Sequence, residues 1–69
     1  MDIQKSLSKL FESGISDAEV GRSINVSTSI INRLRRGVHK TTSYERGKLI
    51  EDFMIKNKID PVINNEHKN

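Results

Sequence analysis

Residues 16–37 read SDAEVGRSINVSTSIINRLRRG, and this stretch decides the fold. Ser16 and Glu19 have the spacing of a capping box, in which each side chain satisfies a free amide at a helix start. That helix is short because Asn25 soon follows, and asparagine adopts a positive φ at low cost. Ser27 can cap a second helix, and Gly37 can end it. The stretch therefore predicts two short helices joined by a tight turn.

The spacing over residues 17–36 fits a helix-turn-helix, the unit that places its second helix in a DNA major groove. Two helices that cross closely need a small residue at the crossing, and Gly21 stands in the middle of the first one. The shared interior needs apolar side chains from both helices, and these are Val20, Ile24, Val26, Ile31 and Leu34. Each feature alone is weak evidence, but together and in this order they favour a helix-turn-helix.

The helix predicted over residues 27–36 carries polar side chains on the arc opposite its apolar face. At about 100° per residue, that arc contains Thr28, Ser29, Asn32, Arg33 and Arg36. Arginine can bond a guanine edge, asparagine an adenine edge, and serine or threonine a base or a phosphate. We therefore expect these five residues to read bases. Contacts to phosphates, which position the helix without reading sequence, are expected from Arg22, Ser27, Arg35, Lys40 and Arg46.

The positive charge of the chain is concentrated around the same segment. The 69 residues carry 12 basic and 9 acidic side chains, for a formal charge of +3. Residues 22–48 contain seven of the basic side chains against a single acid, Glu45, whereas acids outnumber bases in the flanking segments. Such clustering is expected of a surface that meets a polyanion.

Residues before the central stretch predict one more helix. Ile3, Leu7, Leu10 and Phe11 have the spacing of a single buried stripe on a helix. Asp2 can cap its start, and Gly14 can supply the left-handed residue at its end.

Residues after the central stretch predict a fourth helix and a tail. The segment Thr42-Ser43-Tyr44-Glu45 reads as a second capping box, opening a helix through about Lys56. Its apolar face is expected to contain Leu49, Ile50, Phe53 and Met54, and Gly47 within it indicates close packing by another helix. Pro61 argues against continued helix, so residues 57–69 are expected to be an extended or disordered tail. The predicted fold is an all-α, four-helix domain over residues 1–56.

The segment 16–37 resembles the helix-turn-helix of Cro-type and phage-repressor-type (XRE-like) transcription regulators, and the resemblance extends over roughly residues 3–56. It implies an all-α domain that binds operator DNA in the cytoplasm of a bacterial host cell. It also implies a homodimer, or a heterodimer with another repressor. In that family the start and outer face of the second helix touch bases, as expected here for Thr28 and Arg33. Family members often have glutamine where Asp17 and Thr28 stand, and glycine in place of Asn25.

Other classes of function find little support in the sequence. The chain has no cysteine, which excludes disulfides and thiolate metal sites. His39 and His67 lack ligand-spaced partners, and no serine has the histidine and acid of a catalytic set. We therefore expect no enzyme activity, cofactor, metal, membrane span or small-molecule substrate. Phe11, Tyr44 and Phe53 are too scattered to stack single-stranded bases and are expected in the core.

Two alternatives to operator binding stay open. The apolar segment 59–63 has no evident place in a four-helix core, and exposed apolar groups often mark partner surfaces. The chain could thus be an antirepressor or co-repressor that binds another helix-turn-helix regulator. Binding of structured RNA is less favoured, because the RNA major groove is deep and narrow.

Overall fold

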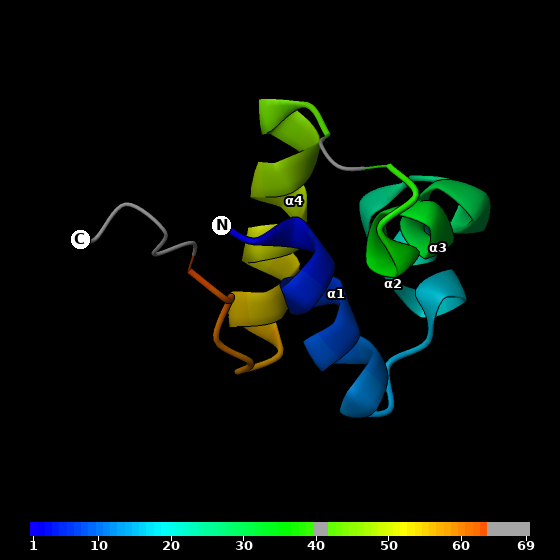
Figure 1. The fold of residues 1–69 in the computed structure, drawn as a ribbon. Coiled ribbons are helices and arrows are strands. Elements are labelled where there is room, and N and C mark those ends of the chain that lie inside the picture. Colours follow the sequence, from blue (N-terminus) through cyan, green and yellow to red (C-terminus); the bar gives the residue numbers. More distant parts are fainter. Residues whose placement is uncertain (40–41, 64–69) are drawn as a thin grey trace.

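The computed structural model describes residues 1–39 and 42–63, and within them the chain forms four helices (Figure 1). They are α1 (Ile3–Glu12), α2 (Asp17–Ile24), α3 (Thr28–Arg36) and α4 (Tyr44–Lys56). Helix α3 packs against α1 and α2, and α2 also packs against α4. The all-α, four-helix prediction is confirmed. None of the described helices is long and apolar enough to cross a lipid bilayer.

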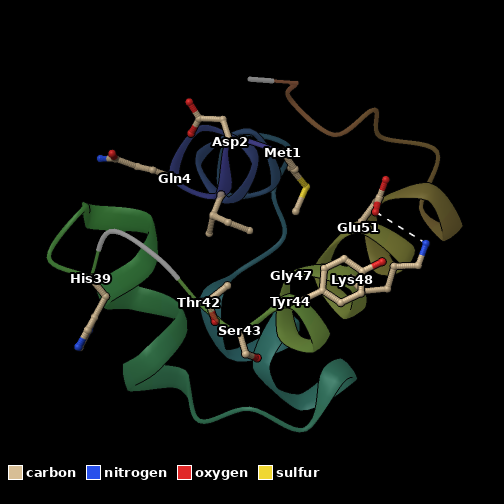
Figure 2. A pocket seen from close by; sticks show the side chains of 11 residues that line it. Met1, Asp2, Gln4, His39, Thr42, Ser43, Tyr44, Gly47, Lys48 and Glu51 are labelled. Atoms are coloured by element: carbon tan, nitrogen blue, oxygen red, sulfur yellow. Dashed lines mark ion pairs between the residues drawn. The ribbon is translucent and has the colours of Figure 1, made fainter. Parts of the chain in front are cut away.

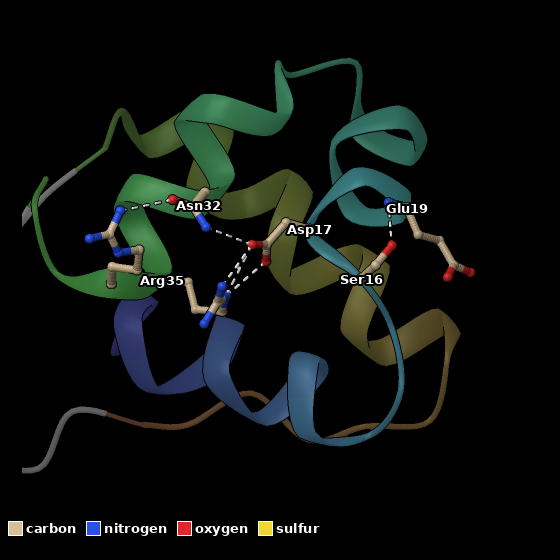
Figure 3. A network of polar contacts seen from close by, with 6 residues as sticks. Ser16, Asp17, Glu19, Asn32 and Arg35 are labelled. Carbon is tan, nitrogen blue, oxygen red and sulfur yellow. Dashed lines mark hydrogen bonds and ion pairs between the residues drawn. The ribbon is translucent and has the colours of Figure 1, made fainter.

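Each helix begins at a side-chain cap. The caps are Asp2, Ser16, Ser27 and Ser43, and each accepts a hydrogen bond from the amide three residues later, at 3.0–3.3 Å. The prediction of a capping box opening with Thr42 is wrong by one position, because Ser43 is the residue that caps α4. At α2 the Ser16 half of the predicted capping box is formed, but the Glu19 half is not, since its carboxylate points away from the helix start (Figure 3).

The predicted turn residues adopt the left-handed conformation. Asn25 has φ 62° and ψ 46°, and Gly37, which ends α3, has φ 82°. Gly14 has φ 95° and lies just after the end of α1. These positions set the ends of α1, α2 and α3, as the sequence predicted.

The core is formed by apolar side chains from all four helices: Leu7, Leu10, Val20, Ile24, Ile31, Leu34, Ile50 and Met54. The expectation that Phe11 and Tyr44 are core residues is wrong, since they are 48% and 83% exposed. Leu49 is also 45% exposed, although the sequence placed it on the apolar face of α4. Ile50 and Met54, predicted on the same face, are buried in the core, and Phe53 packs partly buried against it.

The segment after α4 packs against α1 rather than lying apart from the helices. Its carbonyl at Val62 accepts a hydrogen bond from the Asp2 amide at 2.7 Å, and the Val62 amide donates to the buried Ser6 Oγ at 2.9 Å. Lys9 Nζ donates to the Asp60 carbonyl at 2.9 Å, so the segment runs antiparallel to α1. Ile59 packs against the core. The part of the predicted tail beyond residue 63 lies outside the described residues.

Candidate nucleic-acid interface

The backbone of the turn between α2 and α3 packs directly against Gly21 in α2. A Cβ at this position would collide with the carbonyl oxygen of Val26, which is a backbone atom and cannot rotate away. The Val26 amide donates to the Gly21 carbonyl at 2.8 Å, so both backbone groups of Val26 lie against Gly21. This contact fixes the path by which α2 leads into α3, and it satisfies the requirement for a small residue that the sequence indicated.

Helix α3 presents a polar face to solvent. Ile31 and Leu34 are buried on the inner side, at 0% and 2% exposure. Among the predicted base readers, Thr28, Ser29, Arg33 and Arg36 are exposed and Asn32 is half-buried. The structure therefore places all five predicted side chains on one side of α3, four of them exposed and Asn32 partly covered.

Arg35 was predicted to contact a phosphate, but its guanidinium is engaged within the protein. Its Nε lies 2.9 Å from Asp17 Oδ1 and 3.1 Å from Oδ2, and its Nη2 lies 2.9 Å from Oδ2. The guanidinium also stacks on the Phe11 ring, 4.0 Å from the centroid. With its side chain only 20% exposed, Arg35 joins α1, α2 and α3 instead of facing outward.

The Asp17–Arg35 ion pair also sets the ionisation of the carboxylate that lies beside the polar face of α3. Hydrogen bonding from Arg35 lowers the pKa of Asp17, burial opposes this effect, and Asn32 adds a smaller lowering. The pKa of Arg35 is raised mainly by the same hydrogen bonds. Asp17 therefore carries a full negative charge at neutral pH, and the Arg35 guanidinium compensates it directly.

Asn32 uses both ends of its amide within the protein (Figure 3). Its Nδ2 donates to Asp17 Oδ2 at 3.1 Å, and its Oδ1 accepts from Arg36 Nη1 at 3.4 Å. The two contacts place Asn32 between an anchored carboxylate and an exposed guanidinium.

The other predicted phosphate contacts do not form a single cluster among the described residues. Arg22, Ser27 and Thr28 line a shallow hollow at the α2–α3 turn, together with Ala18, Gly21, Asn25 and Val26. Arg46 is half-buried in the first turn of α4, outside the hairpin. Lys40 lies outside the described residues. Among the described residues, the hollow at the turn brings together two of the predicted phosphate contacts, Arg22 and Ser27.

The partners of Arg35 were not predicted from the sequence. One signal was available, because Arg35 follows Ile31 by four residues, and residues four apart share a helix face. Since Ile31 is buried, that spacing places Arg35 at the edge of the inner face. The identity of its partner could not be read from the spacing, because Asp17 and Phe11 belong to other helices.

A larger cavity, of about 510 Å³, lies between the start of α1, the end of the loop before α4 and the first turns of α4 (Figure 2). Gln4, His39, Thr42 and Tyr44 are among its lining residues. Lys48 Nζ lies 3.9 Å from Glu51 Oε1 at its rim. In the part of the chain that the structure describes, no group of three histidine or acidic side chains could hold a metal ion. The cavity does not include the polar face of α3.

Comparison with protein families, with curated proteins and with solved structures found no match to this chain.

Proposed function

We propose that this protein binds double-stranded DNA in a sequence-specific manner, with α3 in the major groove, as a Cro-like or repressor-like transcription regulator. The observation that carries the proposal is the combination of the Gly21–Val26 crossing with an outward polar face on α3. The crossing belongs to a helix-turn-helix, and the face offers donors and acceptors of the kind that base edges require.

Charge supports a polyanionic partner for this face. Between Glu19 and Glu45 the sequence contains no acid. Asp17 is an acid whose carboxylate contacts α3, and Arg35 compensates its negative charge through three hydrogen bonds. A phosphate backbone approaching Arg33 or Arg36 would therefore meet no uncompensated carboxylate on α3 itself.

In this proposal Arg33 and Arg36 bond guanine edges, and Thr28 and Ser29 contact bases or sugar–phosphate groups at the start of α3. Arg22 and Ser27 hold a phosphate at the turn, and Lys40 and Arg46 are further phosphate contacts. Arg35 is not retained among them, because Asp17 already occupies its Nε and Nη2.

The proposed DNA-binding unit is a dimer on a two-fold-related site. With roughly three basic phosphate contacts from each subunit, the logarithm of affinity should fall with the logarithm of salt concentration at a slope of about −5. Sedimentation velocity of the protein with and without duplex would give the stoichiometry. A slope close to zero would contradict phosphate contacts altogether.

Selection of bound duplexes from a random pool tests the proposal directly. We expect enrichment of one sequence, and we expect Arg33→Ala to lose about 1–3 kcal/mol of binding to it, with relaxed discrimination at one base pair. Lys56→Ala, on the exposed end of α4, is the matched loss of one positive charge and should change specific binding little. No enrichment, or equal losses on selected and random duplexes after Arg33→Ala, would contradict sequence reading by α3.

A further inference from the structure

A chain of hydrogen bonds crosses from the start of α2 to the exposed end of α3. Asp17 Oδ2 accepts from Asn32 Nδ2 at 3.1 Å (Figure 3). Asn32 Oδ1 in turn accepts from Arg36 Nη1 at 3.4 Å. Asp17 is half-buried, with 12% of its side chain exposed, whereas Arg36 is exposed. The chain thus connects a half-buried, ion-paired carboxylate to a side chain at the proposed DNA surface.

We infer that Asn32 is a positioning residue that orients Arg36, and that it does not itself read a base. The inference rests on the proposed function and assigns a division of labour within the same face. Asn32 was expected to bond an adenine edge, which requires its Nδ2 and Oδ1 to face the base together. Here Nδ2 faces Asp17 and Oδ1 faces Arg36, so the two groups are engaged within the protein.

The chemistry of the neighbours fixes which way the Asn32 amide points. An ionised carboxylate only accepts hydrogen bonds and a guanidinium only donates them. With Asp17 on one side and Arg36 on the other, Nδ2 must face Asp17 and Oδ1 must face Arg36. The reverse orientation would set the amide nitrogen against a donor and the amide oxygen against a carboxylate.

Asp17 is a firm anchor for this arrangement. Arg35 bonds it through Nε and Nη2 at 2.9 Å each. The carboxylate also lies in the first turn of α2, where the helix dipole favours negative charge. Because Asp17 is held in this way, the Asn32 amide bonded to it is held as well. Its Oδ1 therefore offers Arg36 a hydrogen-bond acceptor at a fixed position.

The free edge of Arg36 suits guanine. Its Nη1 donates to Asn32, which leaves the Nε–Nη2 edge for two parallel hydrogen bonds to guanine O6 and N7. Holding a long side chain before it binds reduces the conformational entropy lost on binding, an effect of roughly three- to tenfold in affinity. The specified base pair is therefore the one that Arg36 meets, and Asn32 changes how strongly it is read.

A double-mutant cycle between Asn32→Ala and Arg36→Ala on the selected duplex tests this division. We expect Asn32→Ala to weaken binding about three- to tenfold, with the loss confined to preference for guanine at the Arg36 position. In the Arg36→Ala background the same change should cost nothing further. A lost preference for adenine at another base pair, persisting without Arg36, would overturn the inference and make Asn32 a reader.

A measurement without DNA separates this inference from the proposed function. ¹⁵N relaxation of the arginine Nε groups in the free protein should show Arg36 becoming more mobile in Asn32→Ala. Arg33 is the internal control, because its side chain has no hydrogen bond to another described residue, and its mobility should not change. Equal mobility of Arg36 in both proteins would overturn the positioning role even if specific DNA binding is found. A failed duplex selection together with a mobility change confined to Arg36 would leave the orienting contact established and contradict only its use in reading DNA.

Discussion

Gly21 and Val26 are in direct backbone contact across the α2–α3 turn. The Val26 amide donates to the Gly21 carbonyl at 2.8 Å, and the Val26 carbonyl oxygen occupies the space that a Cβ on Gly21 would need. Gly21→Ala must therefore push the turn away from α2. We expect it to lower the free energy of unfolding by about 1–3 kcal/mol, although alanine is the better helix former. Urea denaturation followed by circular dichroism would measure the change.

Gly47→Ala is the matched control, because Gly47 also lies within a helix but has room for a methyl group. A Cβ there would lie 3.7 Å from Ile3 Cδ1 and 3.9 Å from Thr42 Cγ2, which are ordinary van der Waals distances. We expect this variant to be more stable than the wild type by up to about 1 kcal/mol, from helix propensity alone. A loss at Gly47 as large as that at Gly21 would show that the crossing is not special.

The Asp17–Arg35 pair predicts a pH dependence of stability. Hydrogen bonds from Arg35 lower the pKa of Asp17 in the folded protein below the ordinary value of about 3.9. The stabilisation is therefore fully present above about pH 4 and is lost as the pH falls through the folded pKa. At neutral pH we expect Asp17→Asn to cost about 1–3 kcal/mol, and the difference from wild type should shrink below pH 4. Thermal or urea unfolding at a series of pH values would measure it.

An exposed acid provides the control for that pH series. Asp52 lies 3.8 Å from Lys48 Nζ, but its side chain is 60% exposed. Asp52→Asn should change stability by no more than about 0.5 kcal/mol, since solvent screens exposed pairs. If Asp17→Asn behaved like Asp52→Asn throughout the pH range, the pair with Arg35 would not be a stabilising contact.

Ser6 predicts how the segment after α4 is attached. Its hydroxyl is buried and accepts from the Val62 amide at 2.9 Å. Ser6→Ala leaves that amide without its partner, so we expect a loss of about 1 kcal/mol and faster hydrogen exchange at Val62. Ser8→Ala, on the same helix, should leave the exchange rate at Val62 unchanged. Exchange at Val62 that is equally fast in all three proteins would contradict the packing of this segment on α1.

Features set by short-range chemistry could be predicted from the sequence. Hydroxyl and carboxyl caps marked the helix starts to within one residue, and Asn25 marked the turn, because both signals act over a few positions. Gly21 was also predicted correctly as the position that needs a small residue, because two helices joined by a tight turn approach closely there.

Features set by contacts between distant segments could not be predicted. The Ser6–Val62 hydrogen bond joins residues 56 positions apart, and the Arg35 site combines side chains from three helices. Periodicity gave the apolar positions of α4, but which of them are buried depends on where the neighbouring helices lie. For this reason Leu49 is exposed while Ile50 is buried. The close helix packing predicted from Gly47 is likewise wrong, because the space around this residue is large enough for a methyl group.

The most direct test of the central claim is a titration of ¹⁵N-labelled protein with a mixed-sequence DNA duplex at low ionic strength, followed by amide chemical shifts. If α3 lies along the duplex through its polar face, the amides of Thr28, Ser29 and Arg33 should show the largest shift changes. The amide of Arg22, beside the turn, should show a smaller change. Amides in the second half of α4, such as that of Ile55, should remain unshifted. An absence of shift changes, or changes confined to α4, would contradict the assignment of α3 as the nucleic-acid surface.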